Sequence, residues 1–253
     1  DHNLQTLRIV MFIENKYVKF KGLNLTLETL DGLLKHNGPY YDDSDVEKLI
    51  GIKNLKNKIN LKTYPSLEAQ IASISDDIAY NNHDIQDGYR ANLFKLDELK
   101  EIYFFNDIIK KYSRKTKKIN NRVLIYQMAR DSINLMVKDL IRNSLIKFKV
   151  NKINKLNDVY RSEDKLVCFS TRYENIIDEI RHFLNSKMYK NNKILKKNNE
   201  GKKIIEKLFK FISNKPRKFL TFLPIKHNKY RSIADYISGM TDRFAINIYK
   251  SIK

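Results

Sequence analysis

The sequence predicts an all-α protein. It contains only seven Gly and four Pro among 253 residues, which favours long helices joined by short connections. Its apolar residues recur at three- and four-residue spacings rather than alternating, as in amphipathic helices. No window approaches about eighteen consecutive apolar residues, and no signal-peptide pattern opens the chain. We therefore expect a soluble helical protein with no membrane partner.

The N-terminal part is expected to contain four helices. Leu4, Leu7 and Met11 mark the apolar face of the first helix. Asn37-Gly38-Pro39 ends the second, because glycine and proline interrupt helices. Ser66 is placed to cap a long third helix. The expected spans are residues 3 to 14, 27 to 36, 67 to 91 and 96 to 112, with a loop over residues 40 to 64.

A charged run at residues 113 to 121 is the predicted domain boundary. Residues 1–112 would form the first domain, and residues 113–253 a C-terminal helical layer. Residues 191 to 203 are expected to form an exposed turn. Further helices are predicted by apolar series that begin at Ile125, Ile176, Ile204 and Ile233.

Charge limits the possible partners. The formal net charge of +20 should attract polyanions such as nucleotides, nucleic acid or an acidic membrane surface. Residues 187 to 220 contain twelve Lys or Arg against only Glu200 and Glu206. This segment is either a solvated face or a nucleic-acid-binding segment. The single cysteine, Cys168, excludes an internal disulfide, so a cytoplasmic location is expected.

The third expected helix is the informative one. One side should face the core and carries Leu67, Ile71, Ile74, Ile78 and Ile85. The opposite side carries Asp76, Tyr80, His83, Asp84 and Asp87. Carboxylates gathered on one stripe repel one another unless a cation, a basic neighbour or water offsets them. The stripe is therefore either part of a divalent-metal site or the polar side of an ordinary amphipathic helix.

Four motifs in order along the chain resemble the dGTPase family of the HD superfamily. Together these four ordered motifs are far more specific than any single one. In the distal motif an aspartate lies four residues before a tyrosine. The other three lie near the two ends of the chain. The matching stretches are Asp1-His2-Asn3-Leu4-Gln5-Thr6-Leu7-Arg8, Leu23-Asn24-Leu25-Thr26 with Leu33-Leu34-Lys35-His36-Asn37-Gly38-Pro39, Ser66-Leu67-Glu68-Ala69-Gln70 with Asp76-Asp77-Ile78-Ala79-Tyr80 and His83-Asp84-Ile85-Gln86-Asp87-Gly88, and Asp235-Tyr236-Ile237-Ser238-Gly239-Met240-Thr241-Asp242-Arg243.

The resemblance implies roles for the distal motif. Asp76 matches the family's distal ligand of a divalent metal ion, which could be Mg, Mn, Fe or Zn. Tyr80 matches the tyrosine that packs near the sugar and phosphates, and Asp84 matches the aspartate that hydrogen-bonds the deoxyribose 3′-hydroxyl. His83 is interpreted either as supporting the site from behind its direct ligands or as facing solvent, because the family's metal-binding His-Asp pair lies upstream on another helix.

The resemblance also implies roles near the N-terminus. Asn3 and Lys35 match family positions that contact the nucleotide, with Lys35 directing positive charge towards the triphosphate. His2 is a candidate catalytic residue close to the phosphates, or else a polar residue at a helix end. His36 would border the sugar or the base. The motif around residues 235–243 is expected to serve packing rather than catalysis.

The resemblance predicts a partial HD-domain-like bundle followed by the C-terminal helical layer. The activity that the resemblance implies is metal-dependent hydrolysis of deoxynucleoside triphosphates to a deoxynucleoside and inorganic triphosphate. The resemblance also implies a protein that forms homo-oligomers. The sequence lacks the family's early His, its central His-Asp pair and its catalytic His and Glu. We therefore expect the 253 residues by themselves to be inactive. The alternatives are a basic helical module that binds nucleic acid without catalysis, and a pseudo-enzyme subunit.

Overall fold

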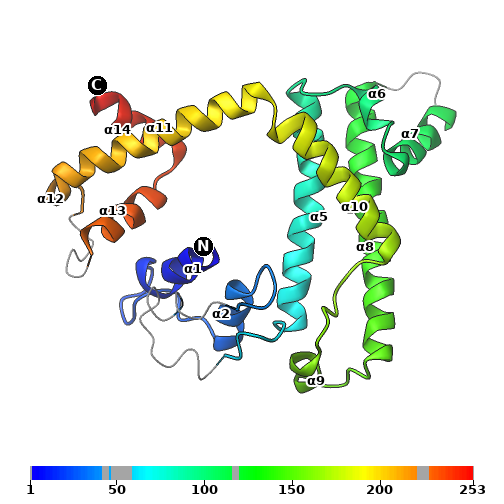
Figure 1. Ribbon diagram of the computed structural model, residues 1–253, viewed down its shortest axis with the longest axis horizontal. Helices are drawn as coiled ribbons and strands as arrows, with labels where there is room; N and C mark the ends of the chain where they lie inside the picture. Colours follow the sequence, from blue (N-terminus) through cyan, green and yellow to red (C-terminus); the bar gives the residue numbers. More distant parts are fainter. Residues whose placement is uncertain (1, 42–45, 47–58, 116–119, 221–227, 253) are drawn as a thin grey trace. The chain divides into compact units, whose positions relative to one another are not determined.

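The computed structural model describes five stretches of the chain: residues 2–41, 46, 59–115, 120–220 and 228–252 (Figure 1). Helices joined by turns and loops make up these stretches, and no strand occurs in them. The predicted all-α fold is confirmed. Most of the loop expected over residues 40 to 64 lies outside the described residues.

The chain divides into two compact units, Asp1–Lys187 and Met188–Lys253. The sequence places a domain boundary earlier, after residue 112. Within the first unit, α7 (Tyr103–Lys115) packs against α8 (Asn121–Val150) across that point. The two compact units are defined by contacts within the folded chain, which do not show where the predicted HD-like domain ends. The division into residues 1–112 and 113–253 therefore stays a prediction.

The first unit begins with a small helical layer. Helix α1 (His2–Arg8) continues as one π-helical turn, η1 (Ile9–Ile13), and packs against α2 (Leu27–Leu34). The Thr26 hydroxyl accepts a hydrogen bond from the backbone amide of Thr29 and caps α2. Both predicted helices are confirmed to within two residues. The buried side chains of this layer are Leu4, Leu7, Leu30, Leu34, Val46, Ile59 and Leu61.

A second layer is built on the long helix α5 (Leu67–Arg90), which packs lengthwise against α8 (Figure 1). Helix α10 (Thr171–Leu184) and α2 also contact α5. The Ser66 hydroxyl accepts a hydrogen bond from the backbone amide of Ala69, so the predicted cap is confirmed. The remaining elements of this part of the chain are α6 (Leu96–Leu99), α9 (Leu156–Arg161) and η2 (Asn185–Tyr189).

The buried face of α5 differs in part from the predicted one. Ile74, Ile78 and Ile85 are buried as expected, but Ile71 is 49% exposed. Gln70 is buried beside it, at 2% exposure, and its side chain forms three hydrogen bonds to the backbone. Its Oε1 accepts from the backbone amides of residues 166 and 167, and its Nε2 donates to the carbonyl of residue 65. At this end of the helix the hydrogen-bonded side-chain amide of Gln70 thus takes the place of an apolar contact.

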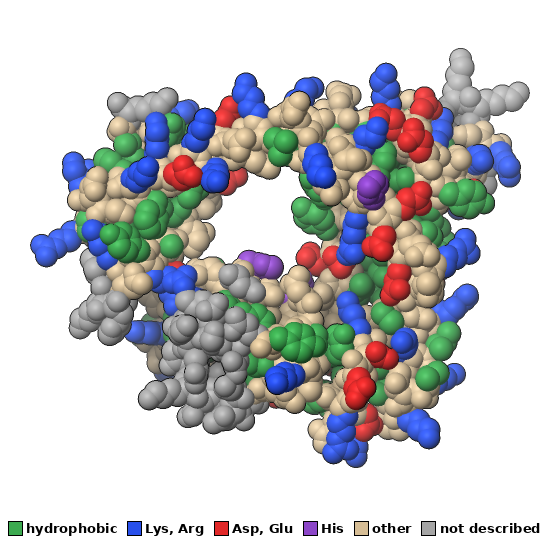
Figure 2. All heavy atoms as spheres, in the orientation of Figure 1, with side chains coloured by type: hydrophobic (Ala, Val, Ile, Leu, Met, Phe, Trp, Pro, Cys, Tyr) green, Lys and Arg blue, Asp and Glu red, His purple; other side chains and the backbone are tan. Residues whose placement is uncertain are grey.

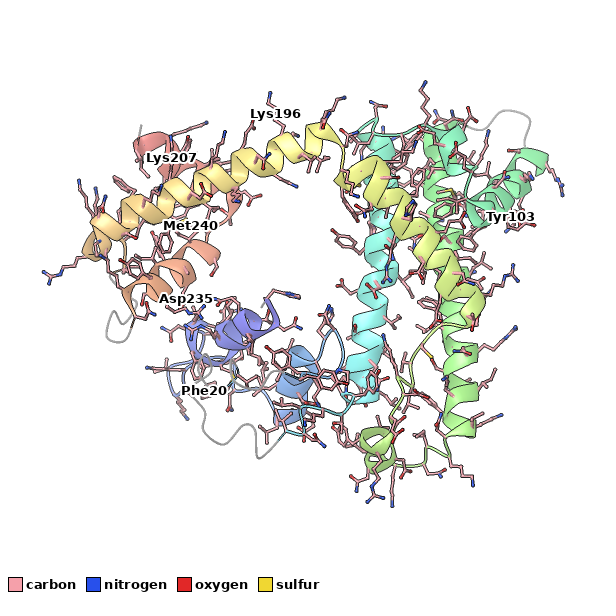
Figure 3. All side chains as sticks on the ribbon, viewed as in Figure 1. Phe20, Tyr103, Lys196, Lys207, Asp235 and Met240 are labelled. Atoms are coloured by element: carbon pink, nitrogen blue, oxygen red, sulfur yellow. The ribbon has the colours of Figure 1, made fainter. Side chains whose placement is uncertain are left out.

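The second unit is built on α11 (Asn192–Asn214), so the turn predicted over residues 191 to 203 is wrong. Asn191 caps this helix by accepting from the backbone amide of residue 193. Figure 3 labels Lys196 and Lys207 on α11. Lysines are good helix formers, and their ammonium groups stay solvated while the helix continues beneath them. A lysine-rich sequence is therefore compatible with a helix as well as with a turn.

Three short helices cover the apolar side of α11. They are α12 (Pro216–Phe219), α13 (Lys229–Ser238) and α14 (Asp242–Ile252), and each contacts α11. Their buried apolar side chains form a single hydrophobic cluster with those of α11. The buried side chains of that cluster are Leu208, Ile212, Leu220, Ile233, Ile237 and Ala245.

Gly32 allows α2 and α5 to approach closely, since a Cβ atom at Gly32 would lie 2.7 Å from the Cβ of Ala69. Gly32→Ala is therefore expected to lower the free energy of unfolding by about 1–3 kcal/mol, as overpacking does. Gly201→Ala is the matched control, because nothing lies within 4 Å of a Cβ there. That control should gain about 0.5–1 kcal/mol from helix propensity. Urea unfolding of both variants tests this, and equal stabilisation would refute the close approach.

Candidate nucleotide site

His36 and Asp76 meet where the end of α2 faces α5. The His36 Nε2 lies 3.7 Å from the Asp76 Oδ2. The Ser73 hydroxyl, one helical turn before Asp76, donates a 2.6 Å hydrogen bond to the His36 carbonyl and fixes the backbone there. The Asp76 side chain is 71% exposed, so it is accessible to a ligand. Two residues that the sequence assigned separately to metal and nucleotide therefore lie together.

Tyr80 and Asp84 follow Asp76 at four-residue spacing and so lie on the same face of α5. Tyr80 is 57% exposed, and Asp84 is half-buried. Tyr80 is thus accessible to a molecule placed along this face, and Asp84 is partly accessible. His83 is exposed, as expected for a residue that faces solvent.

Asn3 has a structural partner in α2. It is buried, and its Nδ2 donates 3.2 Å hydrogen bonds to the Leu34 carbonyl and to the Asn37 Oδ1. These bonds hold α1 against the turn that carries His36. His2 is exposed at the first position of α1, and its carbonyl accepts from the Thr6 hydroxyl. The catalytic role of His2 and the nucleotide contact of Asn3 stay predictions.

Lys35 is buried and paired. It is 2% exposed, and its Nζ lies 2.6 Å from an Asp31 carboxylate oxygen and 3.4 Å from the Thr63 hydroxyl. Burial raises the pKa of Asp31 above its ordinary value, although the hydrogen bond and charge of Lys35 oppose this shift. The positive charge predicted to face the triphosphate is thus already neutralised by Asp31.

A polar cavity of about 330 Å³ opens beside His36 and reveals two cations that the sequence analysis missed. Arg181 reaches it from α10, and its guanidinium lies 3.1 Å from the Asp77 carboxylate. Lys165 reaches it from the segment that Gln70 holds. Nothing local distinguishes these two among 49 Lys and Arg residues. Only the folded chain brings them to the cavity that His36 and Asp77 line.

His36 and Asp76 are both residues that can bind a metal ion. Catalytic sites usually offer about three protein ligands to the ion. In the part of the chain that the structure describes, no group of three or more His, Cys, Asp or Glu side chains could hold a metal ion. His36 and Asp76 supply two candidate ligands at most. They do not form a complete metal site by themselves.

The surface of α11 is strongly basic. Figure 2 shows more Lys and Arg than acidic side chains over the visible face of this helix.

Among the described helices, none combines the length and apolar character needed to cross a membrane.

Comparison with known proteins gives one family. Residues 167–251 match the phosphohydrolase-associated domain. A deoxyguanosinetriphosphate triphosphohydrolase-like protein of Pelagibacter ubique is 62% identical over 252 residues, which cover 100% of this chain and 68% of that protein. Proteins of the same name from Rickettsia typhi and Rickettsia felis are each 34% identical, over 99% of this chain and 66% and 67% of their own lengths. The chain therefore belongs to the deoxyguanosinetriphosphate triphosphohydrolase-like protein family.

Proposed function

We propose that this chain binds a deoxynucleoside triphosphate along α5 and belongs to an enzyme that hydrolyses it to a deoxynucleoside and inorganic triphosphate. The observation that carries the proposal is the convergence of His36, Asp77 and Arg181 around one polar cavity, with the Asp76 carboxylate 3.7 Å from the His36 imidazole. The relatives' shared name supports the substrate class.

In this proposal the phosphates occupy the polar cavity. Arg181 donates hydrogen bonds to phosphate oxygens, and Lys165 adds a point charge. Asp77 holds the guanidinium of Arg181 in place before the nucleotide arrives. Such preorganised cations stabilise negative charge that develops on a triphosphate leaving group.

The sugar is proposed to lie against the exposed face of α5. Tyr80 contacts its ring and leaves little room for a 2′-hydroxyl, which favours a deoxyribose. Asp84 accepts a hydrogen bond from the 3′-hydroxyl. These two positions follow from the family motif and from their four-residue spacing on α5.

Asp76 is proposed as one ligand of the divalent ion that such hydrolysis needs, with further ligands besides the residues described. Two candidate ligands bind a divalent ion weakly. We therefore expect the 253 residues alone to bind nucleotide without hydrolysing it.

The test is release of inorganic triphosphate from dGTP with Mn²⁺ or Mg²⁺. It compares the 253-residue chain with the protein as its gene encodes it. The gene-encoded protein should release triphosphate, Asp76→Ala should abolish the release, and the exposed control Asp107→Ala should not affect it. No release from that protein would refute the hydrolase. Release unaffected by Asp76→Ala would refute the role of Asp76 as a metal ligand. Release by the 253 residues alone would refute the claim that the metal ion needs further ligands.

A further inference from the structure

The polar cavity beside His36 is held together by α5. Three polar side chains of this helix, Gln70, Ser73 and Asp77, line the cavity at helical spacing. The Ser73 hydroxyl donates to the His36 carbonyl, and the Asp77 carboxylate holds the guanidinium of Arg181. Ser73 and Asp77 therefore each fix one wall of the cavity. The proposed function gives no role to Gln70, which belongs to the distal motif.

Gln70 joins two walls of the cavity that are distant in the sequence. Its Nε2 donates a 2.9 Å hydrogen bond to the Pro65 carbonyl, and its Oε1 accepts from the backbone amides of Leu166 and Val167 at 3.0 and 3.1 Å. Gln70 is buried, so these bonds are shielded from water. The amide of Leu166 directly follows Lys165, whose side chain lines the cavity. Gln70 thus fixes the backbone from which Lys165 extends.

The segment that carries Lys165 has two further anchors, which come from α8. Asn143 donates hydrogen bonds of 3.0 and 2.8 Å to the carbonyls of the two residues before Ser170. Asp139 accepts hydrogen bonds from the backbone amide and the hydroxyl of Ser170. Neither Asn143 nor Asp139 lines the cavity. Among the described residues, Gln70 is therefore the anchor that holds the segment at the cavity.

We propose that Gln70 is a positioning residue that holds Lys165 towards the phosphates of the bound nucleotide. This role rests on the proposed function, because it requires phosphates in this cavity. A lysine side chain has many rotamers, and a loose backbone would add further freedom that binding must remove. Backbone fixed by Gln70 before binding leaves only the side chain of Lys165 to be ordered. Gln70 therefore acts through Lys165 and not by contact with the substrate.

The test is a double-mutant cycle in which calorimetric titration gives the affinity for dGTP. Lys165→Ala should weaken dGTP binding about tenfold, because one charge-assisted contact is lost. Gln70→Met keeps the length of the side chain, removes its hydrogen bonds, and should weaken binding about three- to tenfold. The same substitution in Lys165→Ala protein should cause no further loss, because the cation that Gln70 positions is already absent. Equal losses in both backgrounds would show that Gln70 only stabilises the fold and would overturn the proposal.

Asn143→Ala is the matched control, because it removes two hydrogen bonds to the same segment away from the cavity. It should leave the affinity for dGTP unchanged. Added NaCl should weaken dGTP binding less in Gln70→Met than in the unsubstituted chain, because fewer protein charges contact the phosphates and can be screened. A loss in Asn143→Ala as large as that in Gln70→Met, or an unchanged salt dependence in Gln70→Met, would contradict the positioning role.

Two outcomes separate the role of Gln70 from the proposed function. If the unsubstituted chain binds no dGTP, both are refuted. If it binds dGTP and the cycle shows equal losses, only the role of Gln70 is refuted. Amide hydrogen exchange tests this role without any substitution, which covers the case that Gln70→Met does not fold. The Leu166 and Val167 amides should exchange more slowly when dGTP binds, and unchanged exchange would overturn the proposal.

Discussion

Lys35→Met is expected to lower the free energy of unfolding by about 3–5 kcal/mol, the cost of removing one partner of a buried ion pair. Lys35 and Asp31 are both buried, and their charged atoms lie 2.6 Å apart. Without the ammonium, Asp31 must ionise unpaired or take up a proton. The measurement is urea unfolding at neutral pH, with the exposed Lys62→Met as the matched control.

The double variant Asp31→Asn/Lys35→Met separates charge from packing. If the unpaired carboxylate causes the loss, replacing Asp31 by the neutral amide should restore most of the stability. Loss of stability that persists in the double variant would show that packing dominates. A Lys35→Met chain as stable as the wild type would contradict the buried pair and would leave Lys35 available for the triphosphate.

Arg181→Ala is expected to weaken dGTP binding about 10- to 100-fold, because hydrogen bonds to charged groups contribute about 1.5–3 kcal/mol. The Arg181 side chain is 49% exposed, so the substitution should leave the fold intact. Arg172→Ala lies on the same helix, is exposed, and provides the control. Calorimetric titration of dGTP into each variant gives the affinities.

Asp77→Asn tests how Arg181 is positioned. Loss of the carboxylate removes the 3.1 Å contact that holds the guanidinium towards the polar cavity. We expect a smaller loss of dGTP affinity than in Arg181→Ala, because the cation remains but is less ordered. Unchanged affinity in Arg181→Ala would exclude this residue from the phosphate site.

Local signals in the sequence were sufficient for the start of α5, although they did not reveal the start of α11. Ser66 was predicted as a cap because its hydroxyl can accept a backbone amide, and the structure confirms it. The spacing of Asp76, Tyr80 and Asp84 placed them on one face of a helix whatever its partners. Such features depend only on neighbours along the chain.

Long-range partners could not be predicted in the same way. Periodicity assigned Ile71 to the core, but Gln70 occupies that side because its amide reaches backbone groups 96 and 97 residues away. Arg181 lies 104 residues after Asp77 in the sequence, and no local pattern links them. The motif pointed to Lys35 but not to its buried partner Asp31. Apart from the N-terminal half of α11, what the sequence missed are contacts between elements that meet only after folding.

The most direct measurement is the affinity of the chain for dGTP compared with GTP. If the exposed face of α5 binds a deoxynucleoside triphosphate, dGTP should bind more tightly than GTP, and Tyr80→Ala should reduce this preference. Failure of dGTP to bind, or equal affinity for dGTP and GTP that Tyr80→Ala does not change, would contradict the proposed site.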